Sequence, residues 1–235
     1  MIRAVVFDIG QTLTYYPIPL NWSGMYRQAF GSVAETLGFT ISEEEYAHIG
    51  ETLAKYNARI HPREVEVPAD VIFSEILQGT RIDKNLLQDV KREFFSFFRS
   101  DVCVYPEAER TLAELKERGL PIATLSDVPY GMDNVYALED IRPLLKYVDL
   151  PYTSNDIGFR KPSGKGLLRI AQELELRPEE LAFVGDEAKD MECARNAGAL
   201  GILVNRTDEK KEFGQDLEIR DLAELLHCVS GDGSV

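Results

Sequence analysis

Short apolar runs alternate along this chain with segments in which apolar residues recur every three to four positions. The apolar runs are Arg3–Phe7, Pro121–Leu125, Tyr147–Pro151, Leu181–Val184 and Leu200–Val204. Each run is bounded by Gly, Pro, Asp or Ser, and such fully apolar runs are typical of parallel strands buried on both faces. Helical patterns lie between them, so the sequence predicts an α/β fold with a doubly wound, mostly parallel sheet.

The helices of this predicted sheet domain have recognisable ends. The patterns Glu107–Arg118 and Glu187–Ala197 stop at Gly119 and Gly198, and glycine favours the left-handed position that follows a helix. Ser163 is a suitable cap for a third helix. The apolar stripe of that helix, which we expect to pack in the core, consists of Leu167, Leu168, Ile170, Ala171 and Leu174.

Residues 17–98 show no convincing strand and instead contain four helical patterns. Ser42 and Glu45 have the spacing of a capping box. The helix after them places on one face Tyr46, Ile49, Leu53, Tyr56 and Ile60. Helices near Met25–Leu37 and Ala69–Leu77 and a helix starting near Asp83 complete a predicted four-helix bundle. The last of these buries Leu86, Leu87, Val90, Phe94 and Phe97.

The strand pattern begins before this bundle and resumes after it, so the bundle is predicted to be an insertion. We expect a core domain of residues 1–16 and 99–235 and a helical domain of residues 17–98. The predicted linkers are Tyr15–Asn21, which contains two prolines, and Arg99–Tyr105.

Composition narrows the classes of function. The net charge of −14 argues against nucleic-acid binding and against attraction to anionic lipid. No 18-residue apolar segment occurs, and the N-terminus enters a strand at once, which predicts neither secretion nor membrane spanning. Three cysteines without metal-ligand spacing indicate neither a disulfide framework nor a zinc site, so a cytoplasmic protein is expected.

Polar residues with possible chemistry follow the predicted strands. Asp8 closes the first run, Ser126 ends the second, and Asp186 follows the fourth, with Asp190 four residues later. Lys161 lies just before a helix start. Each residue alone has a commoner explanation as a turn, capping or solvated side chain. Because ligands bind outside the carboxyl ends of parallel strands, the acids together predict a Mg²⁺ site there.

In this order, Asp8, Thr12, Ser126, Lys161, Asp186 and Asp190 resemble the motifs of the haloacid dehalogenase superfamily of phosphohydrolases. The resemblance covers essentially the whole chain, because the inserted bundle is similar to the helical cap of that superfamily. The stretch Val104-Tyr105-Pro106-Glu107-Ala108 also looks like the family's approach to its second motif.

The resemblance implies a role for each motif residue. Asp8 would attack phosphorus and form an aspartyl-phosphate, and the cap would close over a small phosphorylated molecule. Catalysis would also use Thr12, Ser126 and Lys161. Mg²⁺ would be held by Asp8, the backbone carbonyl of Gly10 and Asp186, with Asp190 near the metal or its waters. The positions that contact phosphate would be Gly10, Gln11, Ser126, Asp127 and Lys161.

The first motif departs from the family pattern. Family phosphatases usually read Asp-x-Asp-Gly-Thr, whereas this chain reads Asp8-Ile9-Gly10-Gln11-Thr12. The missing second Asp normally protonates the leaving alcohol and then activates water, which is worth about 10²–10⁴ in rate. An amide does not exchange a proton near neutral pH, so Gln11 cannot replace it.

Several functions remain open at this point. The enzyme would be a slow phosphatase, one that prefers good leaving groups such as acyl phosphates or aryl esters, or one that transfers its phosphoryl group to an acceptor. A phosphate-binding or regulatory protein with little turnover is the alternative from another class. Dehalogenation is disfavoured by the pair Asp186 and Asp190, and a phosphonate hydrolase would need a cap lysine, for which Lys55 is the candidate.

Two further features stay open as well. The cationic segment at residues 57–63 is either a solvated helix end or a contact for an anionic substrate. The chain is expected to be a monomer or a homodimer.

Overall fold

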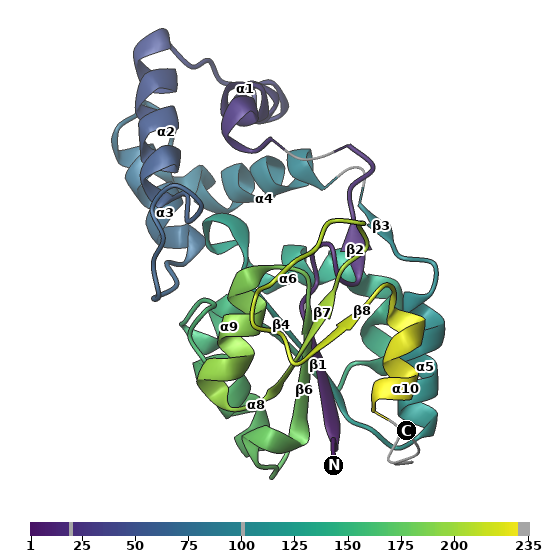
Figure 1. Cartoon of the computed structure of the whole chain (residues 1–235). Coiled ribbons are helices and arrows are strands. Elements are labelled where there is room, and N and C mark those ends of the chain that lie inside the picture. The colour runs from purple at the N-terminus through teal and green to yellow at the C-terminus, as the bar shows by residue number, and fades with distance from the viewer. Residues whose placement is uncertain (19–20, 100–101, 230–235) are drawn as a thin grey trace.

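The core of the molecule is a six-stranded parallel sheet with the strand order β5-β4-β1-β6-β7-β8. The computed structural model describes residues 1–18, 21–99 and 102–229. The strands are β1 (Ala4–Phe7), β4 (Ile122–Ser126), β5 (Leu150–Thr153), β6 (Leu181–Gly185), β7 (Leu200–Val204) and β8 (Leu217–Ile219). This arrangement confirms the predicted α/β fold (Figure 1).

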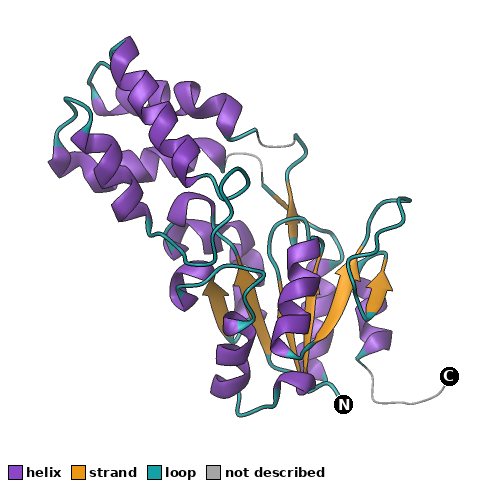
Figure 2. Cartoon of the chain, turned by 60° about the vertical axis from the view of Figure 1, so that its left-hand side comes forward, coloured by secondary structure: helices purple, strands orange, loops and turns teal. Residues whose placement is uncertain are grey.

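Helices cover both faces of this sheet, as Figure 2 shows. Alternate side chains of β1 point to opposite faces. Val5 and Phe7 pack with α5 (Ala108–Glu117) and α10 (Leu225–Cys228). Ala4 and Val6 pack with α8 (Lys165–Glu173) and α9 (Ala188–Ala197). Shorter elements in this domain are η3 (Pro129–Gly131), α6 (Asn134–Ala137), η4 (Leu138–Tyr147), α7 (Ser154–Ile157), η5 (Pro178–Glu180) and η6 (Leu222–Glu224).

The insertion is the predicted bundle, and it lies beyond the carboxyl ends of the strands (Figure 1). Its helices are α1 (Tyr26–Leu37), α2 (Glu43–Tyr56), α3 (Ala69–Gln78) and α4 (Leu87–Phe98), with the short η1 (Ser23–Met25) and η2 (Lys84–Leu86). Buried aromatic rings fill its centre, and Phe73 and Phe94 pack edge to face with ring centroids 5.2 Å apart. We call this bundle the cap.

The limits of the cap at residues 17 and 98 stay a prediction. The apolar cluster of the cap also includes Val128, Tyr130, Met132 and Ala137, which the sequence pattern assigned to the core domain. A short antiparallel pair that the sequence did not predict, β2 (Thr14–Tyr15) with β3 (Cys103–Val104), joins the two linkers. Linker residues 19, 20, 100 and 101 and core residues 230–235 lie outside the described residues.

Four expected features of the fold are wrong in detail. Ser163 does not cap α8, because the residue before that helix is Gly164 and no side-chain cap hydrogen bond forms there. The strand expected at Tyr147–Pro151 is β5, which begins three residues later, because the preceding residues form η4 with Ile141 and Leu144 buried. Ile60 does not continue α2, since the backbone N–H of Arg59 donates to the side chain of Asn57 in a turn. Leu168 is 44% exposed because α8 turns Leu167, Ile170 and Ala171 of its stripe inward and Leu168 away from them.

The capping box of α2 forms as predicted and also connects two parts of the cap. Ser42 Oγ accepts from the backbone N–H of Glu45, and the Glu45 carboxylate accepts from the backbone N–H of Ser42 at 2.8 Å. The same carboxylate accepts from the backbone N–H of Arg81 at 2.7 Å and from its guanidinium. The hydrogen bond from the Arg81 side chain, with those from backbone N–H groups, lowers the pKa of Glu45 from its ordinary 4.5.

We expect Glu45→Gln to lower the free energy of unfolding by about 1 kcal/mol at pH 7, the usual size of a capping interaction. Because the pKa of Glu45 is lower in the folded state, its stabilising contribution is complete above about pH 4.5 and is lost as the pH falls through the lowered pKa. Urea unfolding at several pH values measures this. A difference from wild type that persists unchanged at pH 3 would contradict the assignment.

Candidate active site

Three strand ends at the centre of the sheet position the polar residues of the first, second and fourth predicted runs. β1 lies between β4 and β6, with Phe7 opposite Thr124 and Val184. The backbone N–H of Asp8 donates to Val184 O at 2.9 Å, so the β1–β6 ladder continues into the site. The expected meeting of Asp8, Ser126 and Asp186 at one sheet edge therefore occurs, and all three line one cavity.

The ammonium of Lys161 lies in the middle of this site. It is 2.6 Å from Asp8 Oδ1 and 2.6 Å from Asp190 Oδ1, and the Lys161 side chain is only 2% exposed. Burial disfavours its charge, but the attraction of Asp190 and Asp8 outweighs this and raises the pKa of Lys161. The loop that carries it is fixed by a hydrogen bond from the backbone N–H of Lys161 to Asp127 Oδ1 at 3.0 Å.

Three carboxylates form a cluster around the lysine. One oxygen each from Asp8, Asp186 and Asp190 lie within 4.8 Å of one another. Burial raises the pKa of Asp8 to about 6, although Lys161 opposes the shift. Burial and repulsion by Asp8 and Asp190 raise the pKa of Asp186 to about 8. Carboxylates that repel one another in this way favour a divalent cation, and hard oxygen donors suit Mg²⁺.

Asp190 differs from the other two acids in its hydrogen bonds. Its Oδ2 accepts from the backbone N–H groups of Asp186 and Glu187 at 3.1 and 2.9 Å, and its Oδ1 faces Lys161. The residue is fully buried at the start of α9. Asp190 therefore shapes the turn that presents Asp186 and holds Lys161, whatever it contributes to a metal.

The other predicted site residues surround this cluster. The buried Thr12 hydroxyl donates to Asp186 Oδ1 at 3.5 Å. Ser126, half-buried, lines the cavity, and Gln11 is exposed with a left-handed backbone at φ 57°. The Asp127 carboxylate is occupied by the Lys161 backbone, Arg160 and Lys189. The contact of Asp127 with phosphate stays a prediction, and it would have to be made by the backbone of Asp127.

Gly10 leaves open space where the family pattern has its second carboxylate. A Cβ built on Gly10 meets no heavy atom within 4 Å, and the residue is exposed to the cavity. Packing against neighbours therefore does not require glycine here. The site has room for the missing side chain but does not contain it.

The cavity that contains these residues lies between the sheet edge and the cap, and its volume is about 1290 Å³. Cap residues on its wall include Trp22, Asn57, Arg59 and Arg63. The cavity is large enough for a substrate that extends from the carboxylates of the sheet edge to the residues of the cap. The inserted bundle therefore forms part of the site.

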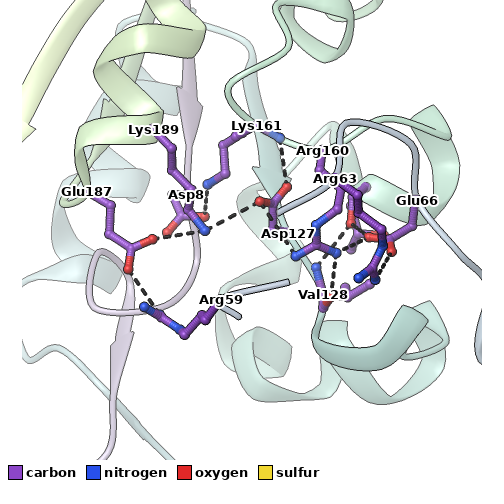
Figure 3. Close-up of polar contacts among 12 residues, drawn as sticks. Asp8, Arg59, Arg63, Glu66, Asp127, Val128, Arg160, Lys161, Glu187 and Lys189 are labelled. Carbon is purple, nitrogen blue, oxygen red and sulfur yellow. Dashed lines mark hydrogen bonds and ion pairs between the residues drawn. The ribbon is translucent and has the colours of Figure 1, made fainter. Parts of the chain in front are cut away.

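Alternating charges connect the cap with the core along this cavity, as Figure 3 shows. Arg59 of the cap pairs with Glu187 at 3.0 Å, and Glu187 pairs with Lys189 at 2.9 Å. Lys189 in turn lies 3.3 Å from Asp127. Burial alone would raise the pKa of Glu187, but Lys189 and Arg59 lower it to about 2, so Glu187 remains charged.

A second, buried network fastens the cap beside the Lys161 loop, and the sequence pattern does not predict it. The Glu66 carboxylate, with a side chain 1% exposed, pairs with Arg160 and with Arg63 and accepts from Ser154 Oγ at 2.5 Å. Backbone bonds join the same segments, from Glu66 N to Gly158 O at 3.0 Å and from Arg160 N to Glu64 O at 2.7 Å. The one available signal was an acid between two valines, Val65-Glu66-Val67.

The remaining cap cations have different places. Lys55 donates to both carboxylate oxygens of Glu75 at 2.7 and 2.9 Å and does not line the cavity. These hydrogen bonds raise the pKa of Lys55, opposite to the shift that a Schiff-base lysine needs. The cationic segment at residues 57–63 meets both environments left open above. Arg59 and Arg63 line the cavity, whereas His61 is exposed to solvent and does not line it.

Comparison with known proteins agrees with this geometry. Residues 2–198 match the family model of the haloacid dehalogenase-like hydrolases. The chain belongs to this family. It is 29% identical over 238 residues to a phosphoserine phosphatase of Thermus thermophilus, covering 95% of this chain and 90% of the relative. It is 27% identical to a glyceraldehyde 3-phosphate phosphatase of Methanopyrus kandleri, covering 97% of each chain.

The fold by itself is shared more widely in the family. The crystal structure of a 2-haloacid dehalogenase from Pseudomonas syringae pv. Tomato DC3000 superimposes with a TM-score of 0.67 at 19% identity, covering 97% of each chain. The family model therefore identifies the protein as a haloacid dehalogenase-like hydrolase, and both relatives described above are phosphatases. Within the described part of the chain, every helix is too short or too polar to traverse a bilayer.

The buried network predicts a large effect of removing Arg160. We expect Arg160→Ala to lower the free energy of unfolding by about 3 kcal/mol, the low end of the range for breaking a buried ion pair, because Arg63 and Ser154 still contact Glu66. Urea unfolding measures the loss. The matched control Arg27→Ala removes the exposed pair with Glu43 and should leave the midpoint close to that of wild type. Equal effects of the two variants would contradict a structural role of the network.

Proposed function

We propose that this hydrolase is a Mg²⁺-dependent phosphohydrolase that acts through an aspartyl-phosphate on Asp8 and serves small phosphorylated molecules with good leaving groups. The observation that carries the proposal is the Asp8 carboxylate, held at the central strand end, paired with Lys161 and open to the cavity. The phosphatase relatives support the same reaction class.

In the proposed first step, an Asp8 oxygen bonds to phosphorus while the bond from phosphorus to the leaving oxygen breaks. The leaving oxygen departs with the electron pair. Lys161 and the Ser126 hydroxyl offset the negative charge that develops on the phosphoryl oxygens. In the second step water attacks phosphorus, the bond to Asp8 breaks, and inorganic phosphate and the free carboxylate result.

The acidic cluster fits the proposed cofactor. Asp8, Asp186 and the backbone carbonyl of Gly10 would hold Mg²⁺, with Asp190 close by. When bound, the ion supplies further positive charge against the transferring phosphoryl group. Lys161 is already paired with two of the three acids, so it balances only part of their charge.

Gly10 determines the proposed preference among leaving groups. No carboxylic acid stands at this position to protonate the leaving oxygen or to activate water, and Gln11 carries only an amide. A leaving group that is stable as an anion departs at nearly the same rate without such an acid, because it needs little protonation. The same glycine supports a second candidate, a phosphate-binding regulatory protein with little turnover.

We expect purified protein with Mg²⁺ to hydrolyse p-nitrophenyl phosphate at a rate that Asp8→Asn reduces by at least about 10³-fold, because the nucleophile is lost. Chelation of the metal with EDTA should abolish the same activity and added Mg²⁺ should restore it. Release of p-nitrophenol measures the rate. Phosphate binding without turnover above the Asp8→Asn rate would favour the regulatory candidate instead.

We also expect Gly10→Asp to speed hydrolysis of alkyl phosphates by about 10²-fold, because the open position can accept a general acid. Release of inorganic phosphate from glycerol 3-phosphate measures this. Gly10→Asn is the matched control of similar size that cannot exchange a proton, and its rate should stay near that of wild type. An unchanged rate in folded Gly10→Asp would show that proton transfer is not what this site lacks.

A further inference from the structure

Part of the wall of the cavity is aromatic. Trp22, the single tryptophan of the chain, lines the same cavity as Asp8. One face of its ring stacks on Phe98, with centroids 3.9 Å apart and an interplanar angle of 17°. That contact holds the indole ring, and part of the ring is accessible because Trp22 lines the cavity and is only half-buried.

The wall beside Trp22 comes from the core domain. Tyr130 and Met132 line the cavity in the segment that follows Ser126 and Asp127, and they are 5% and 3% exposed. The Tyr130 and Trp22 ring centroids are 5.6 Å apart, and the Tyr130 hydroxyl is hydrogen-bonded to Tyr26. One continuous segment therefore carries both the predicted phosphate-binding end of β4 and a ring of the cavity wall beside Trp22.

The backbone of Tyr130 is held in an unusual conformation. Its φ and ψ are 50° and 35°, in the left-handed region that bulky residues rarely adopt. Strain of this kind persists where the surroundings impose it, and it is concentrated at functional sites. Here the left-handed turn places Tyr130 between the Trp22 ring and the Tyr26 hydroxyl. We call the rings of Trp22 and Tyr130, together with the apolar Met132, the aromatic wall.

We propose that the substrates are aryl phosphate monoesters and that the aromatic wall binds the ring of the leaving group. This inference rests on the proposed function, because it names the leaving group of the same reaction. Two independent features lead to it: the aromatic wall shares the cavity with Asp8, and Gly10 provides no proton donor. The volume of about 1290 Å³ also exceeds what a triose-sized ester fills.

A phenolic leaving group fits the chemistry that the site lacks. The pKa of a phenol is about 10, as in tyrosine, whereas that of an alcohol is near the value of about 15.7 for water. A phenolate can therefore depart with the electron pair of the broken P–O bond and take its proton from solvent afterwards. The bond formed is that from the Asp8 oxygen to phosphorus, and water later releases phosphate from Asp8.

Binding can be tested without turnover by phosphonates, whose P–C bond has no oxygen leaving group. Phenylphosphonate and ethylphosphonate carry the same charged group and differ in the ring. With Mg²⁺ and wild-type protein, we expect phenylphosphonate to bind about tenfold more tightly and to change the fluorescence of Trp22, as stacking on an aromatic side chain predicts. Equal affinities, or fluorescence that does not respond to saturating phenylphosphonate, would overturn the proposal.

Variants of Trp22 test where the phenyl ring of phenylphosphonate binds. Trp22→Ala should weaken phenylphosphonate binding about tenfold in calorimetry and ethylphosphonate binding less than twofold, and Trp22→Phe should recover most of the loss. The matched control is Phe39→Ala, because Phe39 is a partly buried aromatic residue of the cap cluster that does not line the cavity. Equal losses for both phosphonates, or the same loss in Phe39→Ala, would contradict a ring site. If Trp22→Ala does not fold, Trp22→Phe and the wild-type comparison decide.

Kinetics separates failure of this inference from failure of the proposed function. We expect kcat/KM for phenyl phosphate to exceed that for glycerol 3-phosphate by at least about 10²-fold, because the proton donor that the alcohol needs is absent. Equal values with good turnover would overturn the aryl preference and leave the phosphohydrolase intact. Ring-dependent phosphonate binding without turnover of any ester would instead support the aromatic wall and refute the proposed function.

Discussion

The ammonium of Lys161, buried between Asp8 and Asp190, is the interaction on which the arrangement of the site depends. Without it, the carboxylates at the end of β1 and the start of α9 would lie close together with little to balance their charge. The loop that carries Lys161 also holds the cap, because Arg160, the residue before Lys161, pairs with Glu66 of the cap. A single stretch of chain therefore offsets part of the charge of the acids at the sheet edge and fastens the cap beside them.

Most of the core architecture could be predicted from the sequence because its determinants are local. Fully apolar runs predicted five of the six strands of the described sheet, β1 and β4 to β7. The rule that parallel strands share a carboxyl edge predicted that Asp8, Ser126 and Asp186 lie together. Strand β8 was missed because Leu217–Ile219 is short and only Ile219 is buried. The pairing of Glu66 with Arg160 could not be predicted, since 94 residues separate them and only the folded chain shows the contact.

The cavity is lined by charged residues from one part of the chain and by aromatic residues from others. The sheet edge provides charge, with acids whose pKa values are raised by burial, whereas the cap and the segment after β4 provide aromatic surface. In the proposed function, the charged groups recognise what all phosphate monoesters share. The aromatic surface is proposed to distinguish among these esters, so that reaction type and selectivity would depend on different parts of the chain. This division explains why family membership alone does not name a substrate.

The short pairing of β2 with β3 has a consequence for the history of such a chain. Thr14 lies opposite Val104, so the points where the cap leaves and re-enters the core are neighbours. An insertion with adjacent ends occupies the space of a surface loop and disturbs no strand of the sheet. Evolution can lengthen, shorten or exchange that insertion while the catalytic edge stays as it is, and new selectivities can arise without rebuilding the chemistry.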